Sequence, residues 1–200
     1  MRVLSAFLAS ATLLLLLACQ PQATAPVYGP WEEGLTLTFE NPSLAQPLRS
    51  EERVQVRVAK SAMAPGSPRL VQLDLTSARG HRSLILLHKD GGIALLGEDS
   101  RVVATPLPAH FPELAPWLDH GTEVRVIGRA RWEGAALLPA TSETVGVWVE
   151  ARPPQGQPRR TLYLPDLGEV ESQEQRDGSW VTINRLVARG FTDLPSTKRP

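Results

Sequence analysis

The feature that most constrains the fold is a period of two in the hydrophobic residues, which begins at residue 35. In LTLTF (35–39) large apolar residues alternate with threonines, and in RVQVRVA (53–59) three valines alternate with polar residues. Because successive side chains of a strand point to opposite faces, each segment predicts a half-buried strand. LVQLDLT (70–76) repeats the pattern, whereas the apolar run SLILLH (83–88) predicts a strand covered on both faces.

Turn signals separate these segments. KDGG (89–92) lies between two apolar runs and predicts a hairpin, because aspartate and glycine tolerate a positive φ. Glu133-Gly134 and Asp177-Gly178 mark two further turns. One short helix is predicted over 111–120, with Pro112 in its first turn. The sequence therefore predicts an all-β protein with one short helical connector.

The order of elements over about residues 69–150 resembles the OB-fold, a small Greek-key barrel with a helix before its fourth strand. The pieces LLHKDGGIALL and VRVIGRA carry the resemblance. It implies a small barrel, to which strands over 35–60 and 160–190 are added within a single β-rich domain over 35–197. The alternative that fits the same short strands and frequent turns is a two-sheet β-sandwich of the immunoglobulin type.

The N-terminus has the layout of an export signal. Arg2 precedes an almost unbroken apolar run over 3–18, which is shorter than the roughly 20 residues that a membrane-spanning helix needs. The run ends at Cys19, the single cysteine of the 200 residues. One cysteine allows neither an intramolecular disulfide nor a thiolate zinc cluster, so its position needs another explanation.

Leu16-Leu17-Ala18-Cys19 resembles the lipobox of bacterial lipoproteins, in which signal peptidase cuts before the cysteine and its sulfur carries a diacylglycerol. The resemblance implies that 1–18 is a signal peptide, recognised through Leu16, Leu17 and Ala18, and that acylated Cys19 attaches the chain to a lipid bilayer. An ordinary cleaved signal or an uncleaved anchor is the alternative.

A lipidated N-terminus and proline-rich tether follow over 19–34, and 198–200 is a short polar tail. An extended chain of this kind rises about 3.1 Å per residue, which gives a reach of roughly 30 Å. These segments predict an extracytoplasmic protein, lipid-anchored to the cell membrane or the outer membrane, with no transmembrane helix in the mature chain.

The bulk charge argues against nucleic acid as a partner, because 21 basic residues balance 21 acidic ones. The sequence contains no phosphate-binding glycine loop, nucleophile elbow, zinc-protease motif or acidic calcium loop. Its histidines lack the local spacing of a metal-ligand pair, and we predict neither a metal nor a cofactor. The histidines are His81, His88, His110 and His120.

The segment TEVRVIGRARW (122–132) supplies the candidate binding face. Period two places Arg125, Arg129 and Arg131 on one side of a strand, and Trp148 on a neighbouring strand would lie beside them. In OB-folds such a charged and aromatic face binds oligonucleotides or oligosaccharides. The simpler interpretation is that the arginines face water because the outside of a half-buried strand is polar.

We therefore expect a membrane-anchored envelope lipoprotein with a non-enzymatic binding or scaffolding role, whose partner is an envelope protein or a glycan. One alternative is an OB-like protein that binds a glycan or polyanionic polymer at the arginine face. The other is an unrecognised hydrolase; Ser83 near His81 and Asp74 is set aside as its triad, because nothing in the spacing enforces the required geometry. A hydrolase would gather two or more of the following in one deep pocket: His81, His88, Asp74 and Asp99.

Overall fold

The structure is a computed structural model that describes residues 26–44, 53–64, 67–112, 115–134, 137–138 and 144–192. These residues contain twelve strands: β1 Leu35–Glu40, β2 Val54–Ala62, β3 Arg69–Ser77, β4 Gly80–Lys89, β5 Gly92–Leu96, β6 Val102–Leu107, β7 Trp117–Asp119, β8 Thr122–Arg131, β9 Val145–Arg152, β10 Arg159–Leu164, β11 Gly168–Arg176 and β12 Ser179–Phe191. In the described part of the chain no helix is long and apolar enough to cross a membrane. Residues 1–25 and 193–200, with Cys19 and its lipobox, lie outside the described residues.

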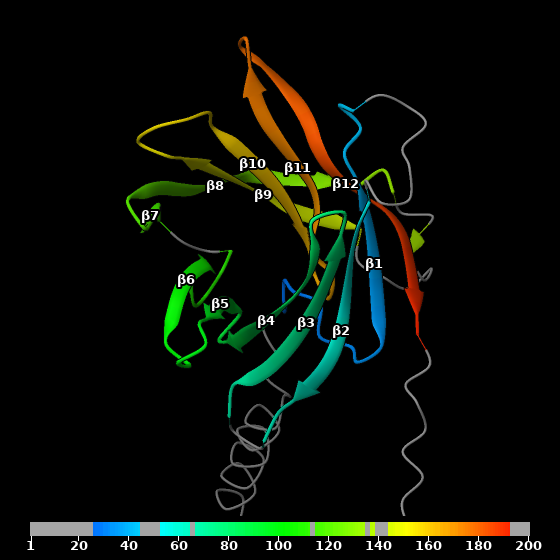
Figure 1. Ribbon diagram of the computed structural model, residues 1–200. Helices are drawn as coiled ribbons and strands as arrows, with labels where there is room; N and C mark the ends of the chain where they lie inside the picture. The colour runs from blue at the N-terminus through cyan, green and yellow to red at the C-terminus, as the bar shows by residue number, and fades with distance from the viewer. Residues whose placement is uncertain are drawn as a thin grey trace, which may run out of the picture.

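The twelve strands form one antiparallel sheet that curls into a nearly closed barrel (Figure 1). Its order is β6-β5-β4-β3-β2-β1-β12-β11-β10-β9-β8-β7, so the first and last strands pair and join two meanders. The edge strands β6 and β7 meet across the remaining opening, where the Thr105 N–H donates to Asp119 Oδ1 at 3.3 Å. The prediction of an all-β fold built as a barrel is confirmed, and the alternative of two stacked sheets is not found.

The strand order differs from the one that the OB-fold resemblance implies. Residues 69–150 supply β3 to β6 at one end of the sheet and β7 to β9 at the other. The two groups are not neighbours in the sheet order, so they do not form a five-stranded Greek-key barrel by themselves. The OB-fold resemblance is therefore not confirmed, and the strands outside 69–150 are integral to the barrel.

The predicted helix over 111–120 is wrong. Phe111 and Pro112 lie in a turn, and Trp117 begins β7, while 113–114 lies outside the described residues. Phe111 is 2% exposed, and its ring meets that of Tyr28 edge-on with centroids 4.8 Å apart. Burial of Phe111 and pairing of β7 with β8 outweigh the local helix signals.

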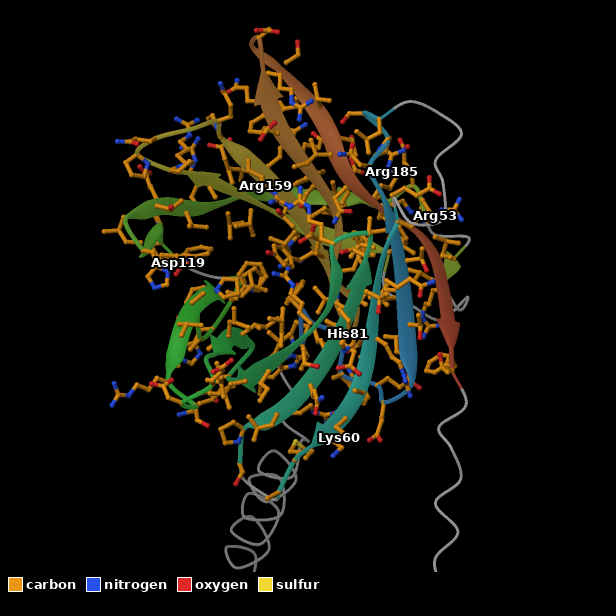
Figure 2. All side chains as sticks on the ribbon, viewed as in Figure 1. Arg53, Lys60, His81, Asp119, Arg159 and Arg185 are labelled. Carbon is orange, nitrogen blue, oxygen red and sulfur yellow. The ribbon has the colours of Figure 1, made fainter. Side chains whose placement is uncertain are left out.

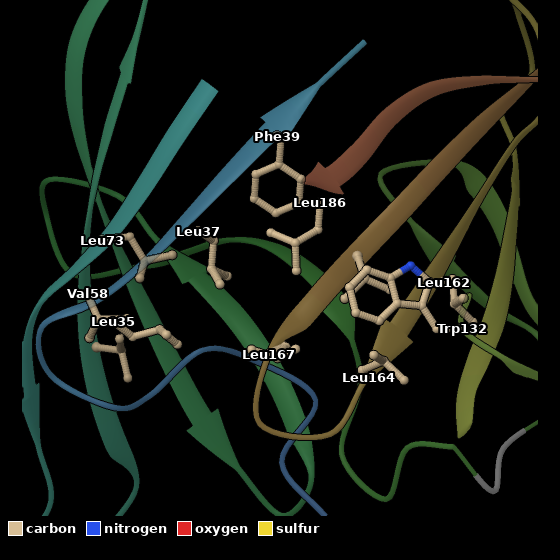
Figure 3. Close-up of a cluster of buried hydrophobic side chains, with 12 residues drawn as sticks. Leu35, Leu37, Phe39, Val58, Leu73, Trp132, Leu162, Leu164, Leu167 and Leu186 are labelled. Carbon is tan, nitrogen blue, oxygen red and sulfur yellow. The ribbon is translucent and has the colours of Figure 1, made fainter. Parts of the chain in front are cut away.

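The predicted alternation appears in the barrel wall. Leu35, Leu37 and Phe39 are 1%, 2% and 5% exposed, and they pack in one cluster with Val58 and Leu186 (Figure 3). The prediction that 83–88 is covered on both faces is wrong, because Ile85 is 42% exposed. A single curled sheet covers only the inner face of β4 along this stretch, so its outward apolar side chains meet solvent.

Candidate ligand-binding cavity

The barrel interior contains an open cavity of about 730 Å³, within the range of about 300–1,000 Å³ that is typical of small-molecule sites. Four consecutive strands supply its apolar wall: Leu37 and Phe39 of β1, Val54 and Val56 of β2, Leu73 and Leu75 of β3, and Leu84 and Leu86 of β4. Val56, Leu75, Leu84 and Leu86 remain only half-buried although they line the interior. The inner faces of these strands are therefore not completely covered by packing.

Residues 26–31, which were predicted to belong to the tether, lie at one end of this cavity. Tyr28, Gly29 and Pro30 are buried and form part of its lining. The Asp166 N–H donates to the Val27 carbonyl at 2.7 Å, and Trp31 Nε1 donates to Asp166 Oδ1 at 2.8 Å. We call this segment the floor. These hydrogen bonds attach it to the β10–β11 turn.

The opposite end opens beside the β3–β4 hairpin into a recess of about 670 Å³, which we call the mouth. Arg79 and Arg82 line both the cavity and the mouth, so the two spaces adjoin at these side chains. Figure 2 labels Arg53, which lines the mouth just before β2 begins, and Lys60 near the other end of that strand. The side chains of the floor and mouth therefore define opposite ends of the site.

Positive charge predominates among the residues that line the cavity and mouth. The charged side chains among them are four arginines and two glutamates: Arg53, Arg79, Arg82, Arg159, Glu40 and Glu169. Arg53 Nη2 lies 2.7 Å from Glu40 Oε1, and Arg159 Nη2 lies 3.7 Å from Glu169 Oε1. Within the described ranges, no carboxylate is within ion-pair distance of Arg79 or Arg82. The mouth thus carries two guanidinium groups without a described counter-ion.

Sequence reasoning missed Arg79 and Arg82. The signal for Arg82 was present, because period two in β4 runs from Leu86 through Leu84 to Arg82 and the arginine faces Leu75 across the β3–β4 pair. Treating 83–88 as apolar on both faces hid this alternation. Arg79 lies in the hairpin turn, where no period indicates a direction.

The far wall of the cavity adds neutral and hydrogen-bonded polar groups. Glu169 Oε1 accepts hydrogen bonds from Asn184 Nδ2 at 2.8 Å and from Ser172 Oγ at 2.7 Å. Burial raises the pKa of the Tyr163 hydroxyl well above its ordinary value, and the charge of Glu169 raises it further. Tyr163 therefore stays a neutral phenol, and Glu169 is held by donors in the wall.

His88 lies beside the floor and is 6% exposed. Burial lowers its pKa to about 4, and the positive charge of Arg69 acts in the same direction. Neither ring nitrogen has a hydrogen-bond partner among the described residues. Arg69 itself stacks over the Trp31 ring, with its guanidinium carbon 4.4 Å from the centroid. His88 is thus a neutral imidazole that is buried beside the floor and near the positive charge of Arg69.

A β-bulge interrupts the strand that was predicted to carry the arginine face. In β8, Val126 pairs with Val149 and Gly128 pairs with Trp148, which leaves Ile127 as an extra residue. Because side chains alternate along a strand, one inserted residue turns every later side chain to the opposite face. A face read with a strict period of two therefore holds only up to Val126.

The four candidate binding residues do not share a face. Arg125 lies on the side of Trp148, whereas Arg129 and Arg131 lie opposite Val147 and Val145 on the other side of the sheet. Arg129 lines a separate cavity of about 220 Å³ near the floor. The structure therefore brings Arg125 and Trp148 to one face and places the other two arginines apart from them.

Arg125 and Trp148 already have partners in the structure. Arg125 Nη2 donates to Glu150 Oε1 at 2.8 Å, and Arg152 Nε donates to the same oxygen at 2.5 Å. The guanidinium of Arg160 lies 5.0 Å from the Trp148 ring centroid. Glu150 and Arg160 were not identified from the sequence, because the register that brings them to this face is not a local pattern.

The residues considered for hydrolysis do not gather in one pocket. Ser83 Oγ donates directly to Asp74 Oδ1 at 2.6 Å, and His81 Nε2 is 4.0 Å from that carboxylate oxygen. A serine nucleophile needs the imidazole between the hydroxyl and the acid, which is not the order seen. His88 lies beside the floor and Asp99 in an exposed turn.

Among the described residues, no group of three or more His, Cys, Asp or Glu side chains is placed to hold a metal ion.

No protein-family model matches the sequence, and no curated protein matches it significantly. Among solved structures, the fold is similar to that of a predicted exported protein with a YmcC-like fold from Bacteroides fragilis, with 12% identity and a TM-score of 0.47 over 83% of this chain and 100% of that one. It is also similar to a predicted lipoprotein from Parabacteroides distasonis, with 12% identity and a TM-score of 0.45 over 83% of this chain and 99% of the other.

Proposed function

We propose that this chain is a lipid-anchored, extracytoplasmic protein of the cell envelope that binds an apolar ligand inside its barrel, without catalysing a reaction on it. The cavity of about 730 Å³ with its apolar wall is the observation that carries the proposal. Burying apolar surface contributes about 25 cal/mol per Å², so a ligand that covers the half-buried side chains of this wall gains affinity without polar contacts.

The arginine face gives less support to a glycan or polyanion site. Arg125 pairs with the carboxylate of Glu150, Arg160 stacks on Trp148, and the bulge at Ile127 separates the remaining candidate arginines from that pair. A ligand at that face would have to compete with these contacts.

Ligand binding is tested with the neutral fluorescent probe N-phenyl-1-naphthylamine and the mature chain without its lipidated Cys19, that is, from residue 20. Val56→Trp and Leu84→Trp each place an indole in the cavity, and Val103→Trp places one at an exposed site on β6 as the control. We expect the wild type and the control to bind the probe and both cavity variants to bind it at least about tenfold more weakly. Equal binding by all four folded proteins would refute a site in the interior.

The lipid anchor has a separate test. Intact-mass spectrometry of the membrane fraction should find an N-terminus at Cys19 that carries acyl chains, and a Cys19→Ala variant should leave the membrane fraction. Acylation accounts for stable attachment because each buried CH₂ contributes about 0.8 kcal/mol. Recovery of Cys19→Ala entirely with membranes would contradict the anchor while leaving the cavity proposal intact.

A further inference from the structure

The apolar ladder on the inner side of β4 ends in a cation. Leu86, Leu84 and Arg82 succeed one another at every second position, and all three line the interior. Arg82 stands opposite Leu75, which also faces the cavity. An arginine at this position brings a fixed positive charge to the point where the apolar wall reaches the mouth.

Arg79 places a second guanidinium beside it. Arg79 lies in the turn of the hairpin and Arg82 on its second strand, and both line the cavity and the mouth. The other two arginines of the site are matched, since Arg53 pairs with Glu40 and Arg159 with Glu169. In the described part of the chain, the excess positive charge of the site therefore belongs to Arg79 and Arg82.

We infer that the ligand is an amphiphile with an anionic head, whose apolar chain lies along the barrel wall toward Tyr28 and whose carboxylate or phosphate is held by Arg79 and Arg82. This inference rests on the proposed function and names its ligand class. Guanidinium groups present paired N–H donors that match the oxygens of carboxylates and phosphates, and these charge-assisted hydrogen bonds are stronger than neutral ones. The wall and the mouth thus select two different parts of one molecule.

The test measures displacement of N-phenyl-1-naphthylamine from the mature chain by four ligands with the same twelve-carbon chain. Laurate and lauroyl lysophosphatidylglycerol carry anionic heads, dodecanol a neutral head and dodecyltrimethylammonium a cationic head, and all are used as monomers in solution. We expect at least one anionic ligand to displace the probe at a concentration about tenfold lower or more than either of the other two. Stronger displacement by laurate identifies a fatty acid, and stronger displacement by the phosphate ester identifies a phospholipid.

Two double variants separate a local from a general charge effect. Arg79→Gln with Arg82→Gln should abolish the preference for an anionic head. Arg101→Gln with Arg176→Gln removes the same net charge at exposed sites outside the cavity and should retain the preference. Displacement that is indifferent to the head, or a preference that survives in the first double variant, would overturn the inference while the apolar site stands. Failure of the wild type to bind the probe would overturn the proposed function and this inference together.

Discussion

The backbone of Gly29 lies against the ring of His88, so that a Cβ added at Gly29 would stand 2.9 Å from His88 Cε1 and 2.7 Å from Ile93 Cδ1. Both distances are shorter than a Cβ contact allows, and both neighbours are buried. We therefore expect Gly29→Ala to lower the free energy of unfolding by about 1–3 kcal/mol, as overpacking in a core does.

Gly190→Ala is the matched control, because nothing lies within 4 Å of the Cβ built there. Its effect should stay within about 0.5 kcal/mol. Urea unfolding followed by circular dichroism measures both variants. Equal stability of Gly29→Ala and the wild type would mean that the floor yields to the extra methyl group.

His88 should make stability depend on pH. Its pKa falls from 6.5 to about 4 on folding, so between these values the unfolded chain binds more protons and stability decreases as the pH falls. The loss is complete below pH 4 and amounts to about 3 kcal/mol. Above pH 6.5 both states are neutral at this residue and the effect vanishes.

The measurement is the free energy of unfolding of the wild type minus that of His88→Gln, taken from pH 7.5 to pH 4. Subtraction removes the titration of carboxylates that the two proteins share. The difference should become less favourable to the wild type by about 3 kcal/mol as the pH falls. The exposed His81→Gln variant serves as the control and should follow the wild type. A difference that is independent of pH would place His88 in a more hydrated setting.

Strand faces were predictable where the pattern is local. Leu35, Leu37 and Phe39 point inward as their spacing indicates, because a strand with one buried face selects apolar residues at every second position. The bulge also had a local signal, since Gly128 follows two consecutive apolar residues and adopts φ of 150°. Reading that glycine as a bulge would have separated Arg125 from Arg129.

Closure of the barrel was not predictable in this way. The hydroxyls of Thr36 and Thr192 lie 3.0 Å apart although 156 positions separate them, and the β1–β12 pairing beside them creates the barrel. No period within either strand encodes which distant strand it will pair with. The cavity could not be predicted for the same reason, because its apolar wall and its far wall come from the two halves of the sheet that β1 and β12 join.

Glu150 and its two arginines predict an asymmetric response to mutation. The Glu150 side chain is 7% exposed, while those of Arg125 and Arg152 are 40% and 54% exposed. Burial acts to raise the pKa of Glu150, but hydrogen bonds and charge from Arg152 and Arg125 outweigh it and hold the pKa below its ordinary value. The pair of arginines therefore keeps a buried carboxylate ionised.

Replacing both arginines by alanine should cost about 3 kcal/mol or more, because it leaves that carboxylate buried without a partner. Glu150→Gln should cost less, about 1–2 kcal/mol, since the two exposed guanidinium groups regain water. Chemical denaturation at pH 7 gives both values. The order of the two costs is the decisive result, and a larger loss for Glu150→Gln would show that the carboxylate is already solvated.

Arg160 lies between two indole rings, with its guanidinium carbon 5.0 Å from the Trp148 centroid and 4.6 Å from the Trp180 centroid. Its Nε also donates to Gln173 Oε1 at 2.7 Å, which fixes the plane of the group. Each cation–π contact contributes about 0.5–1 kcal/mol at a partly exposed site, so Arg160→Ala should lower stability by about 1–2 kcal/mol.

Loss of the guanidinium of Arg160 also exposes both indoles to water and should shift tryptophan emission to longer wavelength. Arg176→Ala removes an exposed arginine from the neighbouring strand and should leave the emission unchanged. An unaltered spectrum in Arg160→Ala would mean that the two rings do not depend on this cation for their cover.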